Sequence, residues 1–140
     1  VREWLESKKL LEKGQSGGIE LYIEPGRFIA GPAVKLEAEV LQVYDGVIVI
    51  NTSVYNCVLD TIVTDIRLLV DGELEDKNSD ENGFYYKIKG NTPTRDDIFR
   101  YKVKLGKEPK VGDKIIFLNA GAYNYTTDFC GLEKLETEVV

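Results

Sequence analysis

Short runs of alternating apolar and polar residues, separated by turn-forming residues, dominate the chain from residue 34 onward. This alternation is typical of β-strands with one buried face, and turns are indicated at Asp45-Gly46, Asp71-Gly72 and Asn82-Gly83. Many short strands with regular turns favour a sandwich or barrel. The expected strands are Val34–Tyr44, Val47–Ile50, Val54–Val58, Ile62–Val70, Gly83–Ile88, Phe99–Val103, Lys114–Leu118 and Glu136–Val140.

The first part of the chain has a different pattern. Val1–Lys13 has the apolar spacing of a short amphipathic helix, Gly14–Gly18 is a glycine-rich break, and Ile19–Ile23 alternates like a strand. Helix, loop and strand in this order form one αβ unit of an α/β fold. We therefore predict a division near Pro32, with an α/β fragment at residues 1–32 and an all-β domain at residues 33–140.

Composition narrows the classes of function. The chain has 140 residues, a net charge of -6 and a pI near 4.8, which argues against a nucleic-acid partner. No apolar run approaches the roughly 20 residues of a membrane span. With two cysteines, the default location is the reducing cytoplasm, and Cys57 lies in an apolar run expected in the core. The absence of histidine excludes Ser-His-Asp catalysis and His-ligated zinc, so we expect no metal site. Because residue 1 is not methionine, we expect the chain to be a piece of a longer protein.

Three segments carry residues of the kinds found at ligand sites. Glu24-Pro25-Gly26-Arg27 follows a predicted strand and is either a plain turn or an anion site, where glycine allows close approach and arginine binds a phosphate. Gly121-Ala122-Tyr123 is either a turn with a core tyrosine or a loop whose phenol donates to a ligand. Gly90–Asp97 is either a hairpin connection or a functional polar loop.

Taken in order, these segments resemble a known family. IEPGRFIAGPAV, VYNCVLD, GNTPTRDDIF and VGDKIIFLNAGAYNYTTDFCG are similar to segments of the fold-type III pyridoxal-phosphate (PLP) decarboxylases, which act on ornithine, diaminopimelate, arginine or carboxynorspermidine. The resemblance runs from the E-P-G-R segment to the final LETEVV and covers most of the chain. It implies a mainly β fold, the C-terminal β-domain of an alanine-racemase-like two-domain enzyme, preceded by the last αβ unit of a (β/α)₈ barrel. It also implies a homodimer with shared active sites.

The same resemblance implies roles for single residues. Glu24 would pair with the pyridine nitrogen of PLP and keep it protonated, which makes the ring an electron sink when CO₂ leaves. Gly26 and Arg27 would bind the phosphate, and Tyr123 would add a contact from the β-domain. Asp97 matches the acidic residue that closes the family's G-P-x-C-x-x-x-D loop and helps to join the two subunits.

Some positions depart from the family pattern. Pro93 occupies the place of the loop cysteine that donates a proton after CO₂ loss, and Thr94 is the adjacent candidate substitute. Asp65 or Asp60 would stand for the acidic residue that recognises the distal amine of a substrate. No lysine matches the family's cofactor lysine, so this fragment alone is expected to be inactive. The alternatives are an inactive homologue that regulates or binds another protein, or a stand-alone β-barrel binding module.

Overall fold

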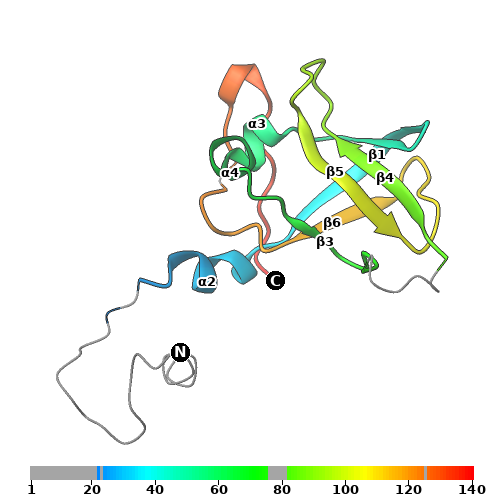
Figure 1. Cartoon of the computed structure of the whole chain (residues 1–140). Helices are drawn as coiled ribbons and strands as arrows, with labels where there is room; N and C mark the ends of the chain where they lie inside the picture. Colours follow the sequence, from blue (N-terminus) through cyan, green and yellow to red (C-terminus); the bar gives the residue numbers. More distant parts are fainter. Residues whose placement is uncertain (1–21, 23, 76–81, 125) are drawn as a thin grey trace, which may run out of the picture.

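The structure is a computed structural model that describes residues 22, 24–75, 82–124 and 126–140, without the side chain of residue 130. A curled six-stranded sheet with strand order β3-β6-β1-β2-β4-β5 forms its body (Figure 1). The expected helix Val1–Lys13 and its glycine-rich break lie outside the described residues. So does the expected strand Ile19–Ile23, except for Tyr22, which is in no strand. The strands are β1 (Leu36–Tyr44), β2 (Val47–Ile50), β3 (Leu69–Val70), β4 (Phe84–Lys89), β5 (Ile98–Leu105) and β6 (Lys114–Leu118).

The sheet curls until its two edges nearly meet. β1 pairs antiparallel with β2 and β6, β2 pairs parallel with β4, and β4 pairs antiparallel with β5. Just beyond β3, the Leu74 amide donates to the Lys104 carbonyl over 2.9 Å, and Glu73 forms a bridge with Leu105 on the opposite edge strand. The described residues therefore form a nearly closed, mostly β barrel, which confirms the expected fold class.

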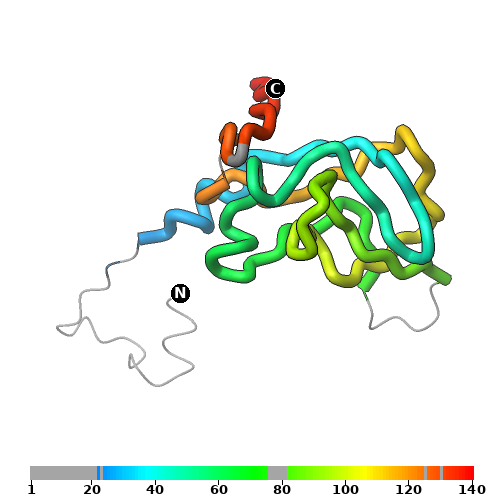
Figure 2. The backbone as a smooth tube through the Cα atoms, turned by 90° about the horizontal axis from the view of Figure 1, so that it is seen from above, coloured from blue at the N-terminus to red at the C-terminus, as the bar shows by residue number. Residues whose placement is uncertain are grey.

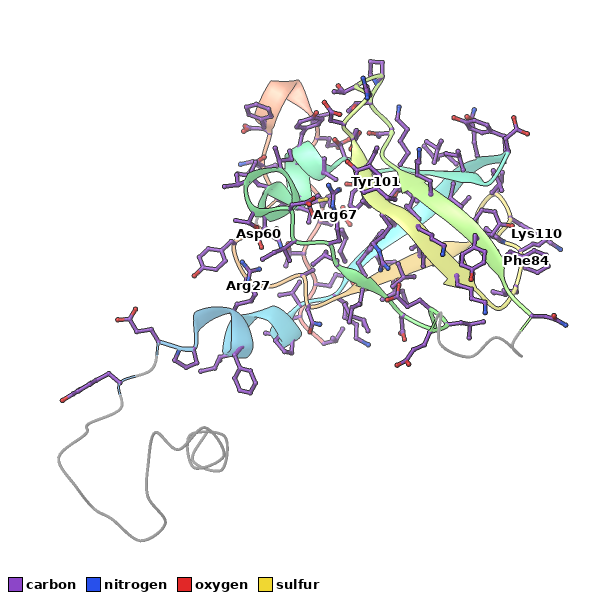
Figure 3. All side chains as sticks on the ribbon, viewed as in Figure 1. Arg27, Asp60, Arg67, Phe84, Tyr101 and Lys110 are labelled. Carbon is purple, nitrogen blue, oxygen red and sulfur yellow. The ribbon has the colours of Figure 1, made fainter. Side chains whose placement is uncertain are left out.

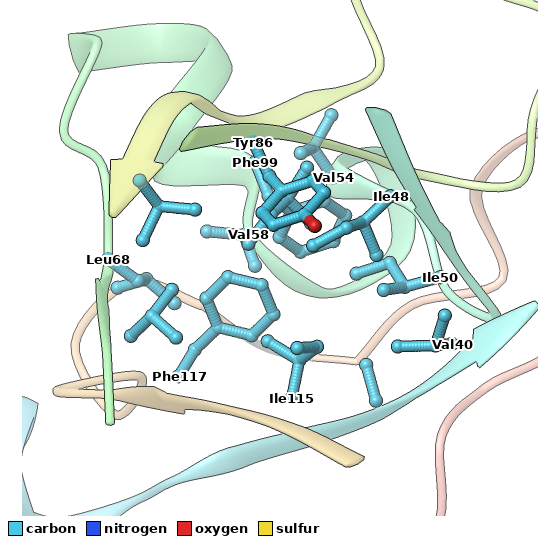
Figure 4. Packing of buried hydrophobic residues seen from close by; sticks show 14 of the residues in the cluster. Val40, Ile48, Ile50, Val54, Val58, Leu68, Tyr86, Phe99, Ile115 and Phe117 are labelled. Atoms are coloured by element: carbon cyan, nitrogen blue, oxygen red, sulfur yellow. The ribbon is translucent and has the colours of Figure 1, made fainter. Parts of the chain in front are cut away.

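The inner face of this barrel is filled by the apolar positions of the alternating pattern. Ile48 and Ile50 on β2, two residues apart, are both fully buried. The rings of Phe99 and Phe117 stack with centroids 5.1 Å apart at the centre of the core (Figure 4). Cys57 packs in the same cluster, as predicted, and burial raises the pKa of its thiol to about 12, so the thiol stays protonated.

Val54–Val58, predicted as a strand, begins a helix instead. α3 (Val54–Cys57) starts after Ser53, whose hydroxyl accepts the Tyr55 amide over 3.2 Å, while the Asn56 side chain accepts the Ser53 amide over 3.2 Å. This reciprocal cap satisfies amides that the helix itself leaves without partners. The valines at either end favour a strand by propensity, and the capping interaction overrides that preference.

The predicted strand Ile62–Val70 is also largely wrong. α4 (Leu59–Thr64) occupies its first part, and Asp65 ends this helix in the left-handed conformation, with φ of 56°. Only Leu69–Val70 is a strand. The predicted last strand, Glu136–Val140, is wrong as well, because these exposed residues adopt no regular structure.

Two short helical segments precede the barrel. α2 (Gly26–Ala30) leads into the 3-10 helix η1 (Gly31–Ala33), and a second 3-10 helix, η2 (Phe129–Gly131), follows the loop after β6. Figures 1 and 2 both place α2, α4 and the loop after β6 at the same end of the barrel. Within the described ranges, no helix is long and apolar enough to cross a membrane.

Candidate anion site between α2, α4 and the loop after β6

Three segments that are far apart in the sequence meet at this end of the barrel. Arg27 comes from α2, Asp60 from α4, and Tyr123 from the loop after β6. In Figure 3, the Arg27 side chain points from α2 toward Asp60. The Arg27 guanidinium donates through Nη1 to Asp60 Oδ2 and forms an ion pair with it. The carbon at the centre of the guanidinium lies 5.1 Å from the centre of the Tyr123 ring, a cation–π contact.

Gly26 and Tyr123 lie against each other. A Cβ atom placed on Gly26 would stand 3.4 Å from the Tyr123 hydroxyl oxygen, an ordinary van der Waals contact, so the phenol lies directly beside the Gly26 backbone. Tyr123 itself has a φ of 58°, an uncommon conformation for a residue with a large side chain. The structure thus brings together three of the four residues predicted to bind a cofactor, namely Gly26, Arg27 and Tyr123.

A glycine also sets how closely this loop approaches α2. The Gly121 amide donates to the Gly31 carbonyl over 3.1 Å, and the Ala120 amide donates to the Val34 carbonyl over 2.9 Å. A Cβ atom on Gly121 would collide with the carbonyl oxygen of Ala30 and lie 3.0 Å from its carbon. The backbone of the predicted motif Gly121-Ala122-Tyr123 therefore packs closely against Ala30 and Gly31. This contact places the Tyr123 ring beside the Arg27 guanidinium.

Asp60 is buried and makes hydrogen bonds with Arg27, Thr64 and Asn124. Its side chain is only 5% exposed, whereas that of Arg27 is 39% exposed. The Thr64 hydroxyl lies 3.0 Å from Asp60 Oδ1 and 2.7 Å from the Asp60 carbonyl oxygen, one helical turn away. The Asp60 amide donates to Asn124 Oδ1 over 3.3 Å. Sequence reasoning proposed Asp60 only as a substrate residue and missed its pairing with Arg27, which lies 33 positions away.

Asn124 is a member of this site that the sequence analysis missed. Its Oδ1 accepts the Asp60 amide, which fixes the orientation of the side-chain amide, because the reverse orientation would set a donor against a donor. Its Nδ2 is buried and has no hydrogen-bond partner among the described residues. A buried donor without an acceptor destabilises a fold by about 1–3 kcal/mol. A ligand atom that accepted a hydrogen bond from Asn124 Nδ2 would remove this cost.

The Arg27–Asp60 pair shifts the pKa values of both groups. The Arg27 guanidinium lowers the pKa of Asp60 below its ordinary value of 3.8, chiefly through the hydrogen bond. The same hydrogen bond raises the pKa of Arg27 above its ordinary value, so the guanidinium stays charged.

We expect the Asp60 pair to contribute to stability at neutral pH but not in acid. Because the folded pKa of Asp60 is lowered, its contribution is complete above its unfolded pKa near 3.8 and is lost as the pH falls through the lower folded value. Urea unfolding from pH 7 to pH 2 checks this. Asp60→Asn should show a shallower loss of stability in acid than the unmodified chain, and identical pH profiles would contradict the assignment.

The loop at residues 90–97 is built around Asp97. The Asp97 side chain is completely buried, and its Oδ1 accepts the Val54 amide over 2.9 Å. Its Oδ2 accepts the Thr92 hydroxyl over 2.6 Å and the Thr92 amide over 3.1 Å. Gly90 packs directly against this carboxylate, with no room for a Cβ atom. The Asp97 carboxylate therefore holds the 90–97 loop together within the chain. Its predicted part in joining two subunits stays a prediction.

The other candidate residues make no hydrogen bond, ion pair or ring contact with Arg27 or Tyr123 in the part of the chain that the structure describes. Thr94 is exposed on the 90–97 loop, which lies beyond α3 from α2 (Figure 1). Asp65 is exposed at the end of α4, and its Oδ1 binds Arg67 over 2.7 Å. Glu24 is exposed just before α2. No group of three or more Cys, Asp and Glu side chains is arranged to hold a metal ion within the described ranges.

Comparisons with known proteins show that this chain is similar to decarboxylases. No protein-family model matches the chain. The carboxynorspermidine/carboxyspermidine decarboxylase of Campylobacter jejuni is 32% identical over 129 residues, covering 82% of this chain and 33% of that protein. The chain thus spans about a third of the length of the curated relative it matches.

Solved structures agree with this match. Carboxynorspermidine decarboxylase from Campylobacter jejuni, solved with norspermidine, is 29% identical with a TM-score of 0.60, over 69% of this chain and 30% of that one. Arginine decarboxylase of Paramecium bursaria Chlorella virus, solved with agmatine, is 29% identical with a TM-score of 0.62, over 78% and 31%. Lysine/ornithine decarboxylase from Vibrio vulnificus, 22% identical with a TM-score of 0.62 over 77% and 30%, shows the fold alone. The homologues and structural neighbours of this chain are therefore fold-type III, PLP-dependent decarboxylases, which confirms the resemblance found in its sequence.

Proposed function

We propose that this chain supplies part of the active site of a PLP-dependent decarboxylase that removes the α-carboxylate of a basic or diamino acid. The observation that carries the proposal is the meeting of Gly26, Arg27 and Tyr123, from opposite ends of the chain, at one place on the surface. An arginine and a phenol beside a glycine backbone are suited to a phosphate group. When bound, PLP supplies an electron sink for the electrons that CO₂ leaves behind.

The residues present fit the phosphate end of this cofactor. Gly26 lies beside the Tyr123 hydroxyl with no side chain between them, and Asn124 Nδ2 is a buried donor that has no acceptor among the described residues. The partly exposed Arg27 guanidinium presents further N–H donors besides the one used by Asp60. In this proposal, Arg27 and Tyr123 hold the phosphate and Glu24 binds the pyridine nitrogen.

The two parts of the chain and the 90–97 loop also have roles in the proposed enzyme. Residues 1–32 end the cofactor-binding barrel and residues 33–140 form the β-domain. The loop at residues 90–97, with Thr94 as its candidate catalytic residue, serves the site of a second subunit in a homodimer. Its position beyond α3, away from Arg27, supports this arrangement. Asp65 and Asp60 are both candidates for the distal amine of the substrate, and each already pairs with an arginine, Asp65 with Arg67 and Asp60 with Arg27. We place the enzyme in the cytoplasm.

Replacing Arg27 with alanine should weaken PLP binding in the full-length decarboxylase. Loss of a hydrogen bond to a charged group typically reduces affinity about 10-fold or more. The dissociation constant is measured by the quenching of protein fluorescence as PLP is added. Lys110→Ala is the control, because it removes an exposed cation at the other end of the barrel from Arg27 (Figure 3). Equal affinities in the two variants would count against this function for Arg27.

The activity itself is tested by CO₂ release. The full-length protein would be given ornithine, lysine, arginine, diaminopimelate and carboxynorspermidine in turn. Release of CO₂ from one of them supports the proposal and identifies the substrate. If PLP binds but CO₂ is released from none, the inactive homologue suggested by Pro93 is favoured instead.

A further inference from the structure

The pair Asn82-Gly83 has no part in the proposed function. The sequence pattern predicts a turn there, but neither residue lies in a turn, and Gly83 does not have the positive φ of the glycines in the other two predicted turns. The pair leads directly into β4, which begins at Phe84. Figure 3 places Phe84 at the opposite end of the barrel from Arg27, so the pair is separate from the candidate anion site.

Packing explains why position 83 is a glycine. A Cβ atom on Gly83 would stand 2.9 Å from both Cγ and Cε of Lys104 and 3.1 Å from Leu74 Cδ1. The Lys104 side chain is buried and lies across this position. The fold therefore favours a residue without a side chain here, and the backbone nitrogen that follows Asn82 has no Cβ atom beside it.

The pair also meets the structural conditions for cyclisation of an asparagine. The Asn82 side chain is exposed and makes no hydrogen bond with a described residue. The Gly83 amide lies just outside β4 and donates to no described residue. Neither the side-chain carbonyl of Asn82 nor the nitrogen of Gly83 is held by a described partner, and the freedom of glycine allows the backbone to bring the two together.

We propose that Asn82 is a site of self-modification, at which the folded protein loses ammonia and gains a carboxylate. The Gly83 nitrogen gives its proton to hydroxide and attacks Asn82 Cγ, so the N–Cγ bond forms while the Cγ–Nδ2 bond breaks. Nδ2 takes up a proton and leaves as ammonia, and a succinimide ring remains. Water then opens the ring at either carbonyl, which gives aspartate or isoaspartate. The inference is independent of the proposed function.

The other described asparagines lack this arrangement. Each of them precedes a residue that has a side chain: Asn51, Asn56, Asn91, Asn119 and Asn124. Hydrogen bonds also hold several of their side chains. Asn51 Oδ1 accepts the Glu39 amide over 2.9 Å, and Asn56 Nδ2 donates to the Glu133 carbonyl over 2.8 Å. We therefore expect the reaction at Asn82 and not at these positions.

The isoaspartate product alters the place where the barrel closes. Phe84 pairs with Leu105, and Leu105 forms a bridge with Glu73 at the opposite edge of the sheet. Isoaspartate lengthens the main chain by one carbon immediately before Phe84, so this end of β4 should open more often. Hydrogen exchange at the Phe84 and Leu105 amides should be faster in the isoaspartate form than in the unmodified protein. Equal exchange would overturn this consequence.

Peptide mapping by mass spectrometry tests the modification itself. The full-length protein is kept at neutral pH and physiological temperature, folded or unfolded in guanidinium chloride. Asn82 should react at a similar rate in both samples, because the fold does not protect it. Aspartate and isoaspartate should both appear, and the rate should rise with pH because the Gly83 nitrogen must lose its proton. Reaction in the unfolded sample alone, or aspartate without isoaspartate, would overturn the proposal.

Two variants locate the reaction. Asn82→Gln keeps the amide and the charge but would need a larger ring, so the product at position 82 should be lost. Asn91→Gln is the matched change at another exposed asparagine, and Asn82 should react in it as in the unmodified protein. Equal release of ammonia from Asn82→Gln and the unmodified protein would place the reaction elsewhere and contradict the assignment.

Discussion

Replacing Gly121 with alanine should push the loop that carries Tyr123 away from α2 and break the proposed phosphate site. The added Cβ atom would collide with the Ala30 carbonyl oxygen and stand 3.2 Å from the Gly31 oxygen, and backbone atoms cannot rotate aside as a side chain does. Overpacking typically costs about 1–3 kcal/mol, and a backbone collision belongs at the upper end of that range. Urea unfolding measures the cost, and the affinity for inorganic phosphate measures the loss of the site.

Gly106→Ala is the matched control for this change. The nearest atom to a Cβ there is 3.8 Å away, so alanine fits without strain. This variant should keep the stability and phosphate affinity of the unmodified chain. If Gly121→Ala also retained both, the close contact between Gly121 and α2 could not be what seats Tyr123 over Arg27.

Replacing Asp97 with alanine should be among the most destabilising changes in the β-domain. It removes the acceptor of three hydrogen bonds and leaves the Val54 amide, the Thr92 amide and the Thr92 hydroxyl without their partner. Breaking a buried network of this kind is expected to cost about 3–5 kcal/mol. The midpoint of urea unfolding measures the loss, and hydrogen exchange of the amides in the 90–97 loop shows whether the loop is released.

The adjacent aspartate provides the comparison for Asp97. Asp96 is exposed in the same loop, and surface changes usually stay within about 0.5 kcal/mol. Asp96→Ala should therefore behave like the unmodified chain. Equal stabilities for the Asp96 and Asp97 variants would contradict the role of Asp97 as the buried anchor of the loop.

The strands were predictable where alternation and turns agree. Val47–Ile50 and Lys114–Leu118 match the structure in both bounds, because each is short and follows turn-forming residues, Asp45-Gly46 and Gly112-Asp113 respectively. The α3–α4 region was not predictable from residue preference. Its valines, isoleucine and threonines favour strands, whereas the cap at Ser53 and the left-handed Asp65 impose helices. A search for capping pairs such as Ser53 and Asn56 would have found the first helix.

The candidate site was predictable in part. The residue types around Arg27 and Tyr123 indicated a phosphate site, and the structure brings the two side chains into contact. Asp60 and Asn124 could not be joined to them from the sequence, because the pairing depends on how α4 and the loop after β6 pack at one end of the barrel. The burial of Asp97 could not be predicted either, because the two charged residues before it, Arg95 and Asp96, are exposed. Only tertiary packing distinguishes Asp97 from them.

The central claim is that α2 and the loop after β6 form one phosphate site, with Arg27 and Tyr123 on the same ligand. A crystal structure of the chain grown with inorganic phosphate tests it most directly. We predict a phosphate bound by the Arg27 guanidinium and the Tyr123 hydroxyl beside Gly26. A Tyr123 ring turned away from Arg27, or phosphate bound elsewhere with this place left empty at saturating concentration, would contradict the account.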